Sequence, residues 1–185
     1  MSGVSLEVAL TSVHDHLTAA RLPHAFGGAI ALAFCIPEPR ATKDIDVNVF
    51  VGPGATDEVL TALPAGVRIV DRNRRELEGD GQSRLHWDDV PIDVFLSNTW
   101  FHGFAEARIR SVPFADLSDL PVLGCAELAV FKAFFARPKD ELDVAMMASH
   151  GTIDLSGLRQ VVARLLGPDD RAQFFERVED IVSRM

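Results

Sequence analysis

The sequence predicts an α/β (α+β) lobe with a mixed sheet, followed by an all-helical lobe. Over roughly the first 115 of the 185 residues, short alternating apolar segments typical of strands are interspersed with segments of helical spacing. From Gly124 onward only helical spacing remains. We therefore expect a mixed-sheet lobe over residues 1–115 and a C-terminal helical bundle over residues 116–185, packed on the cleft of the first lobe.

Prolines, glycines and paired aspartates separate the elements of the first lobe. Pro23 ends the first helix, and Asp88-Asp89 forms a turn between two strands. The expected helices cover residues 6–21, 28–34 and 56–63, and the expected strands cover 43–51, 67–70, 84–87 and 90–96.

The second lobe has helix-end signals in the expected places. Pro138 and Pro168 suit first-turn positions, and Gly151 and Gly167 suit helix ends. The expected helices cover residues 126–135, 138–149, 155–166 and 169–183.

Composition narrows the class of protein. The net charge of −9 argues against a large basic face for duplex nucleic acid, although local positive charge could still hold a strand. The sequence has no apolar run long enough to cross a membrane and no N-terminal signal segment, so we expect a cytoplasmic protein without a membrane partner. Cys35 and Cys125 are expected to be buried and reduced rather than joined as a disulfide.

Two aspartates one residue apart are the first sign of chemistry. Asp44 and Asp46 lie at alternate positions of an expected strand and therefore point to the same side. Two carboxylates aimed at one point repel each other, and a shared divalent cation removes that cost. This pattern indicates a metal site for phosphoryl or nucleotidyl transfer.

A third carboxylate and a glycine pair extend the pattern. Asp93 is a single charge in a later apolar strand, and an adjacent strand would place it beside Asp44 and Asp46 as a metal ligand or a base. Gly27-Gly28 opens a helix about sixteen residues earlier, where backbone N–H groups could approach a phosphate closely.

This order of motifs resembles the nucleotidyltransferase fold of the polymerase-beta superfamily. The resemblance covers roughly residues 24–96 and implies two Mg²⁺ ions, or Mn²⁺, with an NTP as substrate. The second lobe looks like the C-terminal motif of AbiEii/MenT-type toxins of bacterial toxin–antitoxin systems. That motif has a helix lysine followed by an Arg/Lys-Asp-x-x-Asp segment, here Lys132 and residues 139–143.

The toxin resemblance assigns further roles. The Lys132 ammonium is expected to emerge at the edge of a packed surface and to contact the triphosphate. Asp143 would orient Lys132 or the base; whether Asp140 or Asp143 faces the cleft stays open. Thr42 corresponds to a position that a cognate antitoxin kinase can phosphorylate in some members, although its hydroxyl could simply cap the strand. Further nucleotide-binding candidates are Lys43, Arg137 and Lys139.

The resemblance implies transfer of NMP from an NTP to an acceptor hydroxyl, with release of pyrophosphate. The expected acceptor is the 3′ end of tRNA, which would make the protein a translation-blocking toxin. The candidate RNA contacts are Arg40, Arg72, Arg74 and Arg75.

Two alternatives remain at this point. The acidic chain could modify a cationic small molecule such as an aminoglycoside, or attach AMP to a protein. A non-catalytic binding module would be expected to lack part of the carboxylate set, which is complete here. Basic charge around the cleft would favour RNA, and acidic charge would favour a cationic drug.

Overall fold

The computed structural model describes residues 3–185, which form two compact units. The first unit comprises residues up to Ile30 and Ala41–Leu123, and the second comprises Ala31–Arg40 and Gly124–Met185. The second unit therefore takes a segment from the N-terminal half as well as the C-terminal helices. The sheet continues past residue 115, because its strand β6 spans Leu117–Val122.

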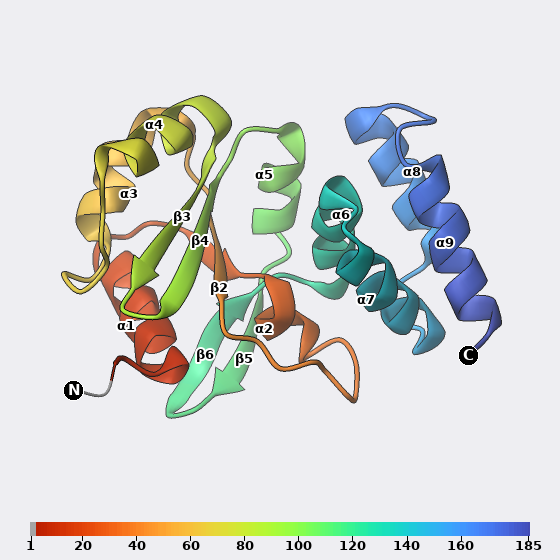
Figure 1. Ribbon diagram of the computed structural model, residues 1–185, viewed down its shortest axis with the longest axis horizontal. Helices are drawn as coiled ribbons and strands as arrows, with labels where there is room; N and C mark the ends of the chain where they lie inside the picture. The colour runs from red at the N-terminus through yellow and green to blue at the C-terminus, as the bar shows by residue number, and fades with distance from the viewer. Residues whose placement is uncertain (1–2) are drawn as a thin grey trace. The chain divides into compact units, whose positions relative to one another are not determined.

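The first unit is built on a six-stranded mixed sheet with strand order β3-β4-β2-β1-β6-β5 (Figure 1). The β2–β4 and β1–β6 pairs are parallel, and the other neighbouring pairs are antiparallel. The strands are β1 His24–Phe26, β2 Ile45–Val49, β3 Gln82–Trp87, β4 Val90–Leu96, β5 Arg110–Phe114 and β6 Leu117–Val122. The mixed α/β class expected from the sequence is confirmed.

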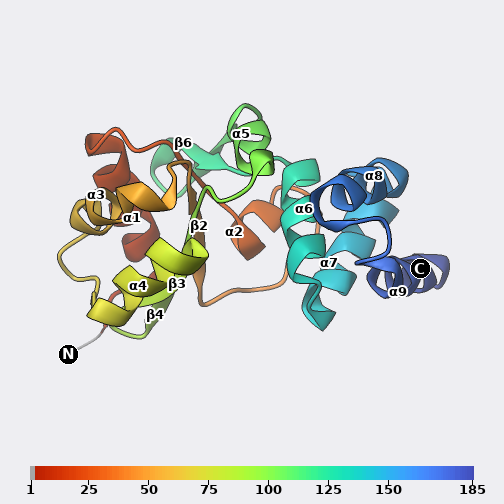
Figure 2. The same cartoon turned by 90° about the horizontal axis from the view of Figure 1, so that it is seen from above.

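Helices cover both sides of this sheet. Figures 1 and 2 show α1 and α3 on one side and α5 on the other. The apolar face of α1 is fully buried, which explains the helical spacing in the sequence. The helices of this unit are α1 Leu6–Ala19, the one-turn η1 Pro53–Ala55, α3 Thr56–Ala62, α4 Asp71–Asp80 and α5 Trp100–Glu106, and α2 Gly28–Leu32 crosses the unit boundary.

The expected strand over residues 67–70 is wrong. Only Arg68 forms a single bridge there, with His86, and the chain then enters helix α4, which ends at Gly81 with φ +70°. Helix α4 has no apolar periodicity that would predict it, because the helix is strongly polar and buries only Asn73 and Leu77. Asn73 holds the helix in place: its Oδ1 accepts from Val70 N–H at 3.0 Å, and its Nδ2 donates to the Arg84 carbonyl at 3.0 Å.

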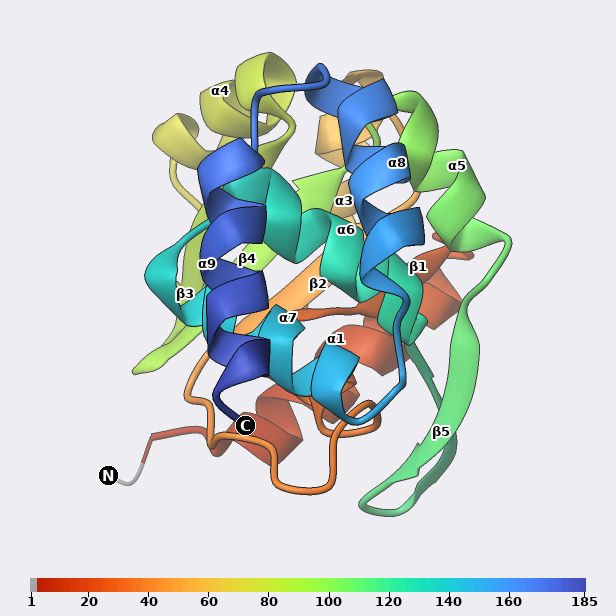
Figure 3. The ribbon, with the colours of Figure 1, turned by 90° about the vertical axis from the view of Figure 1, so that its right-hand side faces the viewer.

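The second unit contains helices that follow the predicted bounds closely. Helix α9 packs on α7, and α8 packs on α6 (Figure 3). The last helix begins later than expected, so Pro168 precedes it instead of lying in its first turn. The bounds are α6 Cys125–Phe135, α7 Pro138–Ser149, α8 Leu155–Leu166 and α9 Ala172–Ser183.

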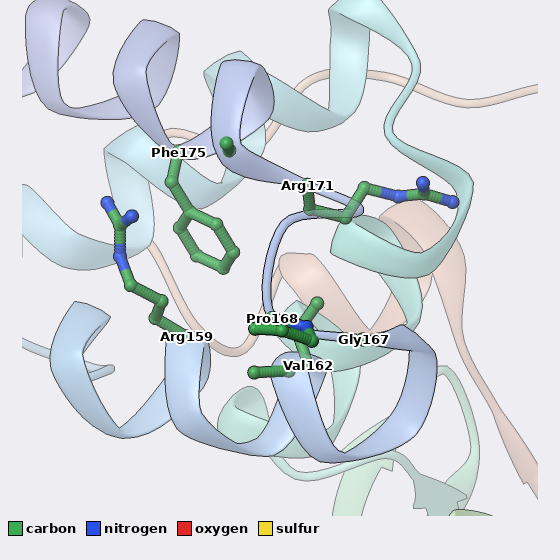
Figure 4. Close-up of a pocket in the computed structure, with 8 residues that line it drawn as sticks. Arg159, Val162, Gly167, Pro168, Arg171 and Phe175 are labelled. Carbon is green, nitrogen blue, oxygen red and sulfur yellow. The ribbon is translucent and has the colours of Figure 1, made fainter.

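Arg159 and Arg171 have structural roles at the junction of α8 and α9 (Figure 4). Arg171 donates to the carbonyls of Ala133 and Phe134 at 2.9 and 2.6 Å, which satisfies acceptors at the end of α6. Arg159 lies over the Phe175 ring at 4.6 Å. The hollow between these side chains is about 10 Å³, enough for about one water molecule. It is therefore a packing gap and no ligand site.

The expectation of two reduced cysteines is also wrong. Cys35 and Cys125 form a disulfide within the second unit, joining the segment after α2 to the start of α6. Cys35 is buried, as expected, whereas Cys125 is half-buried. The two are 90 residues apart in sequence, and the tertiary fold brings their Cα atoms to 5.7 Å. That separation is in the usual range for a disulfide.

Within the described residues, no helix is both long and apolar enough to span a membrane.

Candidate active site

The strand aspartates of the first unit lie on neighbouring parallel strands. Asp46 of β2 and Asp93 of β4 are direct register partners, so their side chains leave the same face of the sheet. Asp44 immediately precedes β2, two residues before Asp46. The expected placement of Asp93 beside the Asp44/Asp46 pair is confirmed by this register. The neighbouring strand positions that face the core are fully buried; they are Ile45, Val47 and Ile92.

A cation that the sequence analysis did not identify lies among these carboxylates. Arg84 of β3 donates to both oxygens of Asp93, with Nε–Oδ1 at 2.7 Å and Nη2–Oδ2 at 2.5 Å. The same Nη2 is 3.8 Å from Asp44 Oδ2. This forked contact is the geometry that a planar guanidinium makes with a carboxylate.

The three strand carboxylates together affect the pKa of Arg84. Its pKa is raised, first by the hydrogen bonds that it donates to Asp93 and then by the charges of Asp93, Asp44 and Asp46, while partial burial opposes the shift. All three strand carboxylates are thus close enough to stabilise one positive charge. The arrangement is an anionic centre in which an arginine supplies the counter-charge.

The sequence contained a signal for Arg84. Asp88-Asp89 is a two-residue turn between β3 and β4, and such a turn fixes the antiparallel register. Counting back from the Trp87↔Val90 pair places Arg84 opposite Asp93. The pairing was therefore derivable once the two strands were recognised as a hairpin.

The glycine pair is packed tightly against the carboxylate centre. Helix α2 begins at Gly28, which has φ +53°, a conformation that favours glycine. A Cβ at Gly28 would overlap the Asp46 carboxylate, and a Cβ at Gly27 would come within 3.2 Å of Asn48 Nδ2. The glycines thus leave room for the Asp46 side chain against the backbone.

Thr42 contacts the first aspartate directly. Its hydroxyl donates to Asp44 Oδ1 and accepts from the Asp44 N–H at 3.3 Å. The neighbouring Lys43 is exposed. A negative charge added at Thr42 would therefore lie next to the Asp44 carboxylate and repel it.

An open hollow of about 630 Å³ lies next to Arg84, between the start of α4 and strand β3. Of the expected RNA-contacting residues on α4, Arg72 lines this hollow and pairs with Glu76 at 3.3 Å. Arg74 instead pairs with Asp57, and Arg75 is exposed. The hollow is mainly basic; its charged and ionisable lining residues are Arg68, Arg72, Arg84, His86 and Asp88.

The candidates of the second unit form a buried charge network. Lys132 of α6 is 2.6 Å from Asp143 Oδ2 and 3.7 Å from Asp140 Oδ1, and all three side chains are almost fully buried. Arg40 also donates to Asp143, with Nη2–Oδ2 at 3.3 Å. Lys132 is thus held by both aspartates of α7, and the expectation that its ammonium emerges at a surface edge is wrong.

The remaining basic candidates are more accessible. Arg137 is 47% exposed and binds Asp140, with Nε–Oδ2 at 2.6 Å, while Asp140 Oδ2 also accepts the Arg137 N–H. Lys139 is exposed in the first turn of α7. Arg40 belongs to the second unit and pairs with Asp143, whereas the arginines of α4 belong to the first unit.

The donor chemistry of the strand aspartates suits a hard divalent cation, because Mg²⁺ prefers oxygen ligands. The close packing of Gly28 on Asp46 provides a cradle that a larger residue would fill. Over residues 3–185, however, no three His, Cys, Asp or Glu side chains are already gathered to hold an ion. The residues therefore fit a metal by chemistry, while the Arg84 guanidinium is the cation that contacts them.

The fold of this chain is similar to that of several proteins of known structure. No protein-family model and no curated protein sequence matches the chain. Among solved structures, ANT(2″)-Ia in complex with adenylyl-2″-tobramycin aligns with a TM-score of 0.59 and 13% identity, over 91% of this chain and 95% of that one. The solution structure of the antibiotic-resistance factor ANT(2″)-Ia gives 0.57 and 14%, over 95% of each chain.

A Helicobacter pylori protein described as a nucleotidyltransferase is also similar, with a TM-score of 0.50 and 13% identity over 99% of this chain and 93% of that one. At these identities the similarity establishes the fold. The chain has the nucleotidyltransferase fold that the glycine pair and strand aspartates predicted.

Proposed function

We propose that this protein is a metal-dependent nucleotidyltransferase that moves NMP from an NTP to an acceptor hydroxyl. The observation that carries the proposal is the register of Asp46 and Asp93 on parallel strands, with Asp44 two residues upstream and Gly28 packed on Asp46. A non-catalytic module would have no need to retain this costly group of like charges.

The reaction requires one bond to form and one to break. The acceptor oxygen bonds to the α-phosphorus, the bond from that phosphorus to the bridging oxygen breaks, and pyrophosphate leaves. Asp93 is the candidate to accept the hydroxyl proton, after Arg84 has released one of its oxygens. Gly27 and Gly28 let the backbone pack directly against the Asp46 carboxylate, beside which a metal-bound phosphate would lie.

Asp44, Asp46 and Asp93 would hold Mg²⁺, or Mn²⁺ in its place, in a two-ion centre. When bound, these ions would neutralise phosphate charge and favour the ionised acceptor. The carboxylates supply the oxygen donors that such ions prefer.

The second unit supplies cations suited to a triphosphate. Arg137 and Lys139 are accessible to solvent, and Lys132 is oriented by its contact with Asp143. We propose that Arg137 and Lys139, together with Lys43, contribute positive charge to triphosphate binding. Lys132 would act through Asp143 without touching the phosphates, because its side chain is only 4% exposed.

We favour an RNA 3′ end, with tRNA as the first choice, as acceptor. The basic hollow beside Arg84 supports this choice, because it offers local positive charge in a chain whose net charge is −9. Arg72 lies in the hollow, and Arg75 is exposed on the same helix. Modification of a tRNA 3′ end would make the protein a translation-blocking toxin.

Thr42 offers a route of control by an antitoxin. Its hydroxyl already contacts Asp44, so a phosphate at this position would add about two negative charges beside a metal ligand. An antitoxin kinase acting on Thr42 would therefore oppose binding of the nucleotide triphosphate.

A second candidate acceptor is a cationic aminoglycoside. The similarity to ANT(2″)-Ia over most of both chains and the acidic composition favour it. Transfer to a protein hydroxyl has no comparable observation behind it.

The test is an acceptor comparison. The protein is incubated with Mg²⁺, each radiolabelled NTP and either total tRNA or tobramycin, and label is followed in each acceptor. We expect label in tRNA, and no label with Asp44→Ala. Labelled tobramycin with unlabelled tRNA would reverse the choice of acceptor. Absence of transfer to both, or full activity of Asp44→Ala, would reject the proposal.

A further inference from the structure

The contact between Arg84 and the strand carboxylates raises a question of competition. Arg84 engages both oxygens of Asp93 and approaches Asp44 at 3.8 Å. These oxygens are also the ones that a divalent cation would need. A guanidinium and a metal ion repel each other, so both cannot keep their shortest contacts with the same carboxylates.

Arg84 can withdraw without disturbing the core. Its side chain is 52% exposed and lines the open hollow of about 630 Å³. Its backbone, in contrast, is fixed by strand pairing with Asp93 and by Asn73, which donates to the Arg84 carbonyl. The side chain can therefore rotate into the hollow while strand β3 stays in place.

We propose that Arg84 is a positioning residue that holds Asp44 and Asp93 together in the metal-free protein and competes with the divalent cation for them. This inference rests on the metal centre of the proposed function. In the metal-free state Arg84 offsets the repulsion among the carboxylates. When metal binds, the guanidinium leaves Asp44 and at least one oxygen of Asp93 and moves toward the hollow.

The charge of Arg84 is the property to test. Arg84→Gln removes the charge and keeps an N–H donor for Asp93, whereas Arg84→Lys keeps the charge and loses the fork. Mn²⁺ binding without nucleotide is measured by calorimetry. We expect Arg84→Gln to bind Mn²⁺ about tenfold more tightly than wild type, and Arg84→Lys to stay within about threefold of wild type.

Thermal melts give a second readout that does not depend on activity. In EDTA, Arg84→Gln should melt below wild type because its carboxylates have lost their counter-charge, and Mn²⁺ should raise its melting temperature more than that of wild type. Arg68→Gln is the matched control, since Arg68 lines the same hollow and, within the part of the chain that the structure describes, forms no ion pair with the three strand carboxylates. Its Mn²⁺ affinity should equal that of wild type.

The outcomes separate the two ideas. Equal or weaker Mn²⁺ binding by Arg84→Gln, or equal tightening in Arg84→Gln and Arg84→Lys, would overturn the role of Arg84 and leave the metal centre standing. Failure of wild type and both variants to bind Mn²⁺ would reject the metal centre and the inference with it.

Discussion

Lys132 of α6 and Asp143 of α7 form an ion pair inside the C-terminal unit, with 2.6 Å between Nζ and Oδ2. Their side chains are only 4% and 5% exposed, so neither charge is solvated. Arg40 also pairs with Asp143, and Asp140 lies close to Lys132. Buried charges of this kind are tolerated only when each has its partner.

Removing both members should therefore cost less than the two single removals added together. We expect Lys132→Met and Asp143→Asn each to lower the free energy of unfolding by about 3–5 kcal/mol, because each leaves a buried charge without its closest partner. The double variant should lose clearly less than the sum, which urea denaturation can measure. Strict additivity would show that the two charges act independently.

Gly28→Ala should abolish nucleotidyl transfer and weaken metal binding. The new methyl group would overlap the Asp46 carboxylate, and the backbone at φ +53° disfavours alanine. Metal affinity and transfer rate are measured together on folded protein.

Gly79→Ala is the matched control for that substitution. Gly79 lies within α4, and a Cβ there meets nothing within 4 Å. This change should raise the free energy of unfolding by about 0.5–1 kcal/mol and leave activity intact. Equal loss of activity in both variants would contradict the role given to Gly28.

The Cys35–Cys125 disulfide should stabilise the second unit. Reduction is expected to lower the free energy of unfolding by about 2–4 kcal/mol, because the bond closes a long loop in the unfolded chain. Melting curves with and without dithiothreitol measure the difference. A Cys35→Ser/Cys125→Ser variant should melt at the reduced protein's temperature and ignore the reductant; a wild type equally indifferent to reductant would show that the bond does not form.

Two buried histidines should make the first unit acid-sensitive. Burial is the main cause that lowers the pKa of His24, helped by the charge of His14 and opposed by the Leu22 carbonyl; burial likewise lowers that of His102. Below about pH 6.5 the unfolded chain takes up protons that the folded chain resists, so stability falls as pH falls.

The loss should reach at most about 1.4 kcal/mol per pH unit for each histidine, measured as urea midpoints between pH 7.5 and 5. His24→Phe should flatten part of this dependence, whereas a substitution at the exposed His150 should leave it unchanged. A wild-type profile that does not change across this range would refute the assignment.

Elements with strong periodicity were predictable. The bounds of α7 and α8 agree with the expected ranges, because proline, glycine and apolar spacing mark them. Helix α4 was not predicted, since its burial of Asn73 depends on hydrogen bonds to β3 and gives no apolar pattern. The disulfide was missed for a related reason: two distant cysteines carry no sign of their proximity.

The shared face of Asp44 and Asp46 and the strand position of Asp93 could be read from the sequence, because alternation along a strand is a local property. Tertiary structure alone decided that Lys132 is buried with Asp143 and that Arg40 pairs with the same carboxylate, since these contacts join distant segments. It also brought Arg84 close to Asp44 in addition to its hairpin partner Asp93, because β2 pairs with β4.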